Sequence, residues 1–148
     1  MINGILQKNE ITKISQPVTD IKNQVIPIIE KIQKLCFVKI GRYPGALALA
    51  HCQIEKENPL TFFVLKTGET IINPLIKAYD KETGTTNLEG CLSLAFRPEK
   101  KIKRFDRILV AYDSVINKKI SKEIMWIDGK RSFIFQHEMD HFKNKYIY

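Results

Sequence analysis

The feature that most constrains this chain is the segment QHEMDH at residues 136–141, in which two histidines stand four residues apart. Residues at that spacing lie on one face of an α-helix, so His137 and His141 can reach a single metal ion. Glu138 lies beside them, where its carboxylate can contact a water on that metal. The spacing therefore predicts a metal-binding helix near the end of the sequence, with Glu138 as general acid/base.

A catalytic metal site of this kind needs a third protein ligand and leaves one position for water. The candidates elsewhere in the chain are His51, Cys36, Cys52 and Cys91. Cys91 lies in LEGCLS at residues 88–93, a glycine-containing turn that exposes a thiol and nearby N–H groups. An odd number of cysteines without an export signal argues against disulfides and leaves this thiol reduced. Taken alone, however, Cys91 would be interpreted as a small buried apolar residue.

The remaining pattern predicts an α+β fold in one domain, residues 1–148. Apolar residues recur at helical spacing over residues 18–38, where Pro27 should kink the helix or mark a restart. Strand-like segments follow at residues 46–54, 61–66, 70–76, 102–112 and 119–127, the last two as an antiparallel pair.

The ends of these elements carry recognisable signals. Pro74 and Pro98 are expected at strand ends or edges, because proline lacks the N–H that a sheet ladder needs. Asp128 is the expected N-cap of the last helix, and Asn144 a left-handed residue that closes it. We therefore expect short antiparallel strands around a C-terminal metal-binding helix, with a further helix near the N-terminus.

The composition excludes some classes of protein. Hydrophobic residues make up 44% and charged residues 27%, which is ordinary for a soluble globular protein, and no apolar run is long enough to span a bilayer. No signal peptide is recognised, so we expect a cytoplasmic protein without a membrane partner. The net charge of +8 is compatible with binding to ribosomal RNA. The 19 lysines and 5 arginines are mostly scattered, so compositional bias explains this positive charge better than RNA binding does. No specific nucleic-acid partner is therefore expected.

Two segments together resemble a known family. EGCLS at residues 89–93 and QHEMDH at residues 136–141 are similar to two signature motifs of peptide deformylases, and they occur in the same order. INP at residues 72–74, and Arg104 followed by ILVAY at residues 108–112, resemble further segments of that family. The resemblance runs from about residue 20 to the end and indicates a short member, truncated at its C-terminus.

The first motif of that family is degenerate here. Its usual form is GxGLAAxQ, whereas this chain has ALALAHCQ at residues 46–53, with alanine in place of both glycines. These alanines could narrow the substrate groove, and Gly45 could compensate one residue earlier. His51, which replaces an alanine, is open to three interpretations: a misplaced ligand, a polar group in the pocket, or an ordinary buried histidine, which we favour.

The resemblance implies removal of the formyl group from the N-terminal formylmethionine of nascent polypeptides. It implies one divalent metal ion on Cys91, His137 and His141, with Fe²⁺ expected and Zn²⁺ or Ni²⁺ possible. Glu138 would take a proton from water and return it to the leaving amine, and the side chain of Gln53 and the N–H of Leu92 would bind the developing oxyanion.

The resemblance also implies a substrate groove. Its expected lining residues are Ala46, Leu47, Ala48, Gly90, Phe133 and Ile134. Phe133 and Ile134 share a helical face with His137 and could hold the methionine side chain, although core packing explains them equally well. Lys130 and Arg131 are expected to make the rim more polar, and Asp140 either pairs with Arg104 or is solvated.

Three other functions are consistent with parts of this pattern. A general metallopeptidase could use the same helix, but it would usually take its third ligand from His or Glu. A deformylase-like protein could bind metal with weak or no turnover, as the degenerate first motif allows. The positive charge allows a basic protein that binds the ribosome transiently, and raised salt would release a purely electrostatic association.

Overall fold

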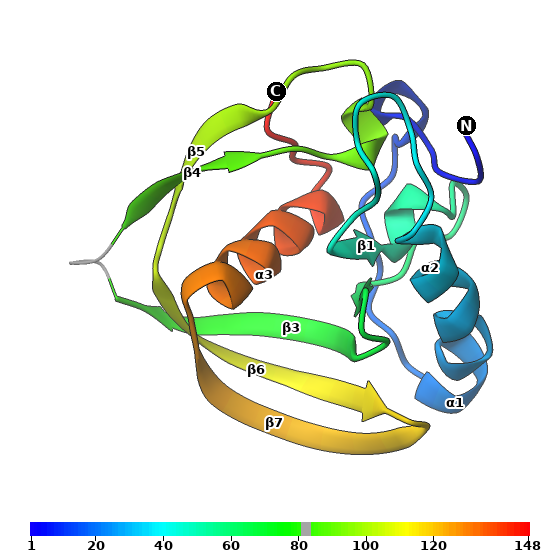
Figure 1. Ribbon diagram of the computed structural model, residues 1–148. Helices are drawn as coiled ribbons and strands as arrows, with labels where there is room; N and C mark the ends of the chain where they lie inside the picture. Colours follow the sequence, from blue (N-terminus) through cyan, green and yellow to red (C-terminus); the bar gives the residue numbers. More distant parts are fainter. Residues whose placement is uncertain (81–83) are drawn as a thin grey trace.

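The computed structural model describes residues 1–80 and 84–148 and shows an α+β fold, as expected. One antiparallel sheet has the order β1-β2-β3-β6-β7, and a second sheet contains β4 and β5. Helix α3 lies between the two sheets, and α1 and α2 lie at the far end of the larger one (Figure 1). The seven strands are β1 Ala48–Ala50, β2 Phe62–Leu65, β3 Thr70–Tyr79, β4 Thr85–Glu89, β5 Lys100–Arg104, β6 Arg107–Ile116 and β7 Lys119–Asp128.

The predicted N-terminal helix is divided into three pieces. They are α1 Ile21–Gln24, the 3-10 turn Ile26–Ile28 and α2 Ile29–Leu35. Asp20 begins the first by accepting a hydrogen bond from the backbone N–H of Asn23 at 3.2 Å. Of the two outcomes expected at Pro27, the structure shows a restart: the helix is interrupted and begins again at Ile29, because proline cannot donate the N–H that a continuous helix requires.

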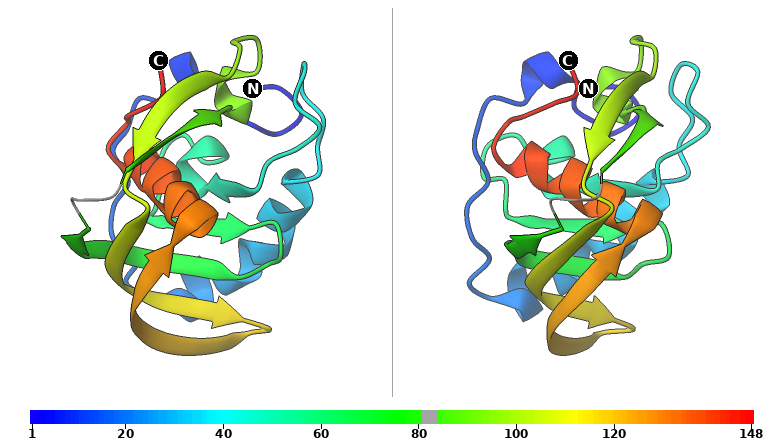
Figure 2. Two further views of the ribbon diagram at one scale, coloured as in Figure 1. Left: turned by 60° about the vertical axis from the view of Figure 1, so that its left-hand side comes forward. Right: turned by 90° about the vertical axis from the view of Figure 1, so that its left-hand side faces the viewer.

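Hydrophobic residues cover both faces of the larger sheet. Adjacent strand residues point to opposite faces, so Ile71 and Ile72 of β3 join different clusters. Ile72 packs with Ile32 of α2, whereas Ile71 packs with Phe135 of α3. The sheet is thus held between the N-terminal helices and α3, which fixes the position of the metal-binding helix (Figure 2).

The predicted strand at residues 102–112 was wrong in one respect, because the chain bends at Phe105 and divides it into β5 and β6. Strand β5 pairs with β4, a polar strand that the sequence pattern did not reveal, while β6 pairs with β7 as expected. Side chains of α3 hold the bend: Gln136 bonds both the N–H and the carbonyl of Phe105, and Ser132 donates to the same carbonyl.

Two other local predictions need correction. Pro74 lies inside β3 and not at its end. It falls at a register shift between residues 72 and 75, where the hydrogen-bond ladder needs no N–H from this position. The extended segment predicted at residues 46–54 is a strand only at β1, after which His51–Gln53 form a 3-10 turn.

Helix α3, Gly129–Phe142, ends as predicted, with Asn144 in the left-handed region at φ 57°. Asp128 stands at the N-cap, but its carboxylate accepts from Arg107 and makes no capping bond. Among the described helices, none combines the length and apolarity needed to cross a lipid bilayer.

Candidate metal centre

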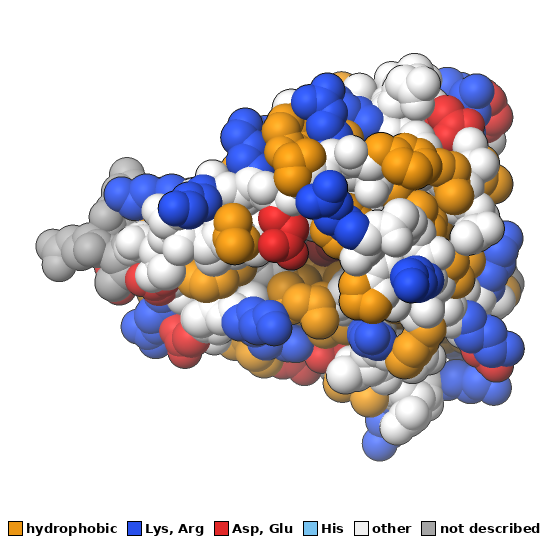
Figure 3. Space-filling model, turned by 45° about the horizontal axis from the view of Figure 1, so that its top comes forward, with side chains coloured by type: hydrophobic (Ala, Val, Ile, Leu, Met, Phe, Trp, Pro, Cys, Tyr) orange, Lys and Arg blue, Asp and Glu red, His pale blue; other side chains and the backbone are white. Residues whose placement is uncertain are grey.

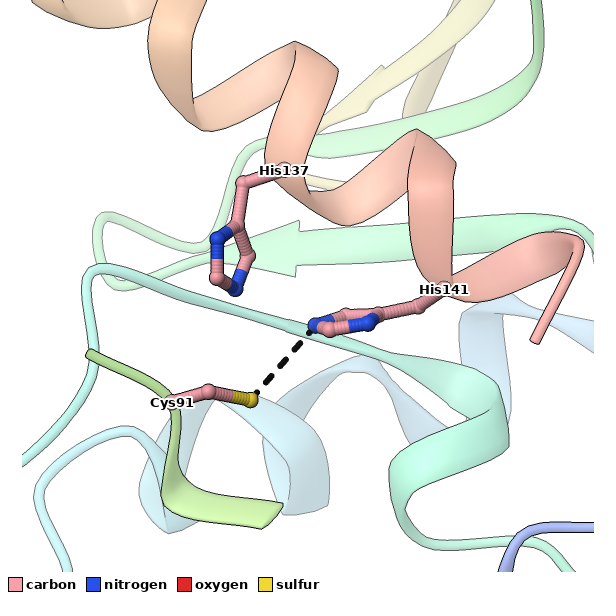
Figure 4. A group of neighbouring side chains, drawn as sticks. All are labelled: Cys91, His137 and His141. Carbon is pink, nitrogen blue, oxygen red and sulfur yellow. Dashed lines mark hydrogen bonds between the residues drawn. The ribbon is translucent and has the colours of Figure 1, made fainter. Parts of the chain in front are cut away.

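Three side chains distant in sequence converge beside α3. Cys91 follows β4, and His137 and His141 lie one helical turn apart on α3. Figure 4 shows all three pointing toward a common centre. Their ligand atoms lie within 4.8 Å of one another, and all three residues are buried. The structure therefore brings together the three residues that the sequence singled out as ligands.

The spacing and chemistry of these atoms fit a divalent ion. A tetrahedral ion with metal–sulfur and metal–nitrogen distances of about 2.3 and 2.0–2.1 Å separates such ligands by about 3.6 Å. Cys91 Sγ lies 3.6 Å from His141 Nε2. One thiolate and two imidazoles leave the fourth position free, as in catalytic sites that bind water. The residues present therefore suit a catalytic metal.

Each histidine is oriented by a contact on its other nitrogen. His137 Nδ1 lies 2.7 Å from Glu89 Oε1, and His141 Nδ1 lies 3.3 Å from the carbonyl oxygen of Lys145. Because both partners are acceptors, each Nδ1 carries the proton and each Nε2 is left free for a metal. Such contacts are common around metal-binding histidines and fix the ring orientation.

Glu89 is itself held by Arg104, which donates to both carboxylate oxygens at 2.8 and 2.9 Å. Burial alone would favour the neutral acid, but hydrogen bonds from Arg104 and His137 outweigh it and lower the pKa of Glu89 to about 2. Arg104 also bonds Asp140 at 2.7 Å, so the structure shows the pairing, one of the two alternatives left open for Asp140. This network ties β4 and β5 to α3 across the metal centre.

Glu138 faces the same centre from α3. It is 4% exposed, and its Oε2 has no hydrogen-bond partner within the described part of the chain. Burial disfavours the charged form and raises the pKa of Glu138 to about 7. A carboxyl group in this state can both accept and donate a proton near neutral pH.

Gln53 approaches the centre from the other side. Its Oε1 accepts from the N–H of Ala50 at 2.9 Å, which turns the amide nitrogen toward the metal site. That nitrogen lies 3.0 Å from Ser93 Oγ and 3.6 Å from Cys91 Sγ. Leu92 comes directly after Cys91 and begins the 3-10 turn Leu92–Leu94. The two predicted oxyanion donors therefore stand next to the ligand cysteine.

A cavity of about 370 Å³ opens onto Glu138 and two of the three ligands, Cys91 and His137. Figure 3 shows a hollowed face on which hydrophobic side chains lie beside acidic and basic ones. The walls include all six predicted substrate-binding residues: Ala46, Leu47, Ala48, Gly90, Phe133 and Ile134. Leu47 is 49% exposed, as suits a wall that a substrate could cover. Lys130 also lines the cavity and makes its rim more polar, as expected, whereas Arg131 pairs with Glu69 instead.

Gly45 lies directly before the degenerate first motif, at a close contact between two backbone segments. Gly45, one residue before it, has φ 153°, and a Cβ there would lie 2.5 Å from the carbonyl oxygen of Cys36. The next N–H, that of Ala46, donates to the same oxygen at 2.8 Å. A glycine is therefore still present where two backbone segments meet closely, although it is displaced by one residue.

His51 is an ordinary buried histidine and not a ligand. Its Nδ1 accepts from the N–H of Leu60 at 2.9 Å, and its ring stacks on Phe62 at 4.7 Å. Burial lowers the pKa of His51 to about 4, so the ring is neutral at physiological pH.

Several residues that support the metal centre or its cavity were not assigned a role from the sequence. Glu89 and Ser93 lie inside the EGCLS segment, and their polarity next to a ligand was the available signal. The ring of Tyr43 packs so closely on Gly90 that a Cβ there would lie 2.4 Å from it. Nothing in the local sequence indicated Tyr43 or the carbonyl of Lys145, because both act through the folded chain.

Comparisons with known proteins agree with this geometry. The family model described as polypeptide deformylase matches residues 4–148. A peptide deformylase of Thermotoga sp. is 31% identical over 137 residues, covering 88% of this chain and 74% of the relative.

Solved structures share the fold. A peptide deformylase from Ehrlichia chaffeensis in complex with actinonin has a TM-score of 0.80 at 20% identity, covering 97% of this chain and 84% of that one. A peptide deformylase from Legionella pneumophila has a TM-score of 0.78 at 22% identity, covering 99% and 83%. Because the family model matches nearly the whole sequence, we conclude that the chain belongs to the polypeptide deformylase family.

Proposed function

We propose that this chain carries out the reaction of its family through Cys91, His137 and His141 as metal ligands and Glu138 as general acid/base. That reaction is the metal-dependent hydrolysis of the N-formyl group from the formylmethionine of nascent polypeptides. The observation that carries the proposal is the convergence of one thiol and two imidazoles beside Glu138, a buried carboxyl group whose Oε2 has no partner among the described residues and which lines the same cavity as Cys91 and His137.

The proton transfers follow from the position of Glu138. Cys91, His137 and His141 would hold a divalent ion, which would supply Lewis-acid chemistry by acidifying water and polarising a carbonyl oxygen. Glu138 accepts one proton from the attacking water. It then delivers that proton to the amide nitrogen as the bond between the formyl carbon and nitrogen breaks. The immediate products are formic acid and a peptide with a free amino terminus; the acid ionises to formate and its proton is taken up by the amine, so atoms and charge balance.

Gln53 and Leu92 would stabilise the oxyanion that forms on the formyl oxygen. The Gln53 amide is aimed by two hydrogen bonds, to Ala50 and Ser93, so little reorganisation is needed when charge develops. Such a donor typically contributes about 3 kcal/mol to transition-state stabilisation. The backbone N–H of Leu92 would supply the second donor.

The methionine side chain would occupy the apolar part of the cavity beside Phe133 and Ile134, while Ala46, Leu47, Ala48 and Gly90 flank the peptide. Lys130, on the rim, would contact later residues of the substrate.

We further propose that residues 1–148 act as one catalytic domain in the cytoplasm, where nascent chains emerge. Ribosome association, if present, would be transient and electrostatic, and Fe²⁺ is the proposed native ion, with Zn²⁺ or Ni²⁺ able to replace it.

The alternative of metal binding without turnover rests on Ala46 and Ala48 in the first motif. Gly45 provides a close backbone approach there. The carboxyl group of Glu138, which would handle the proton, and the amide of Gln53 both line the cavity. These observations favour an active enzyme.

An assay on paired peptides tests the proposal. We expect formate release from formyl-Met peptides and no cleavage of the same peptides without the formyl group. Glu138→Ala should retain metal and lose turnover. Full turnover in Glu138→Ala, or cleavage of unformylated peptides, would contradict the assignment.

A further inference from the structure

The segment that follows α3 returns to pack on the metal ligands. We call residues 145–148 the closing segment. It contacts both the helix that carries the histidines and the loop that carries the cysteine. None of its residues is among the walls of the substrate cavity, so its contacts lie on another side of the centre.

Its first two residues contact His141. The carbonyl of Lys145 lies 3.3 Å from His141 Nδ1 and selects the tautomer in which Nε2 faces the ion. The ring of Tyr146 lies 4.5 Å from the imidazole, at an interplanar angle of 34°. The stacked ring limits rotation of the imidazole about its side-chain bonds.

Its last two residues contact the Cys91 loop, which we define as residues 90–99 between β4 and β5. Ile147 is 7% exposed and packs with Cys91 and Leu94 in one small hydrophobic cluster. The hydroxyl of Tyr148 donates to the carbonyl of Pro98 at 2.9 Å. The segment thus spans the gap between two elements that each carry part of the centre, and it fixes one relative to the other.

From these contacts, and given the metal centre proposed above, we infer that the closing segment is a positioning element for the metal ligands. It holds the His141 ring and the Cys91 loop at coordinating distance and keeps solvent from one side of the ion. Tyr146 is its principal positioning residue, because its ring packs against the ring of the ligand His141. The segment therefore slows release of the metal without touching substrate.

The rate of metal release tests this inference. Apoprotein would be loaded with Co²⁺, whose absorption spectrum reports ligand geometry, and then mixed with excess EDTA. Loss of contacts that orient ligands typically costs 10- to 100-fold in metal affinity, so Tyr146→Ala should release Co²⁺ about tenfold faster or more. Its cobalt spectrum should also shift. Tyr146→Phe keeps the ring, removes only a buried hydroxyl without a partner in the described chain, and should behave like wild type.

Tyr79→Ala is a matched control. Tyr79, at the end of β3, packs on Phe105 at 4.6 Å and 47°, and within the described residues neither ring packs on a ligand ring. Thermal unfolding of each apoprotein would compare the cost to the fold. We expect Tyr79→Ala to keep the wild-type release rate and spectrum, even where it destabilises the apoprotein as much as Tyr146→Ala does.

The outcomes separate the two proposals. Failure of wild type to bind Co²⁺ would refute the metal centre itself. Normal binding by wild type with unchanged release from Tyr146→Ala would refute only the role of the closing segment. Equal acceleration by Tyr79→Ala and Tyr146→Ala would also overturn that role, because loss of stability would then explain the effect.

Discussion

Acidification should destabilise the fold through His51. The ring is 6% exposed, and its pKa falls from 6.5 to about 4 because burial penalises the charged form. The unfolded chain binds a proton at this residue below about pH 6.5, whereas the folded chain does so only near pH 4. Stability is therefore intact above pH 6.5 and decreases as the pH falls through this interval.

The size of the effect follows from linkage. Between about pH 7.5 and about pH 4.5, the mismatch in proton binding at His51 costs about 2.5 kcal/mol of unfolding free energy. Urea unfolding of wild type and His51→Asn at both pH values isolates this contribution, because the other titrating groups are common to both. Asparagine can accept the hydrogen bond from Leu60 but does not titrate.

We expect His51→Asn to be less stable at neutral pH, since it loses the stack on Phe62, and to lose about 2.5 kcal/mol less on acidification. Parallel curves of stability against pH for the two proteins would refute the reasoning, because they would mean that His51 takes up its proton equally in both states.

Three further substitutions have defined outcomes. Gln53→Ala should lower kcat by about 100-fold or more with little change in metal content, measured by formate release; equal turnover would exclude the amide as an oxyanion donor. Gly90→Ala should destabilise the fold by about 1–3 kcal/mol in urea unfolding, because its Cβ would lie 2.4 Å from Tyr43, and unchanged stability would show that this ring yields freely. Arg104→Gln should cost about 3–5 kcal/mol of unfolding free energy and weaken metal retention, since it removes the cation that pairs with both Glu89 and Asp140; wild-type values of both would contradict the proposed network.

The metal-binding helix could be predicted because its information is local. Residues four apart must share a helical face, so the sequence alone placed His137 and His141 side by side. The strong break at Pro27 and the left-handed Asn144 are likewise set by the backbone chemistry of single residues. Choosing Cys91 as the third ligand, in contrast, depended on family resemblance, since three cysteines were available.

The missed features depend on contacts between distant segments. The chain bends at Phe105 because Ser132 and Gln136, about thirty residues later, bind its backbone. Strand β4 has a polar sequence, and it forms because β5 turns away from the main sheet to pair with it. No local pattern encodes such contacts, so the sequence predicted the ligands more completely than their surroundings.

Titration of the apoprotein with Co²⁺ tests the central claim most directly. We predict one equivalent bound, with a sulfur-to-cobalt charge-transfer absorption that is absent in Cys91→Ser, and tight binding lost in His137→Ala and His141→Ala. Cobalt that fails to bind, or that binds with an identical charge-transfer absorption in Cys91→Ser, would contradict a centre built from this cysteine and these two histidines.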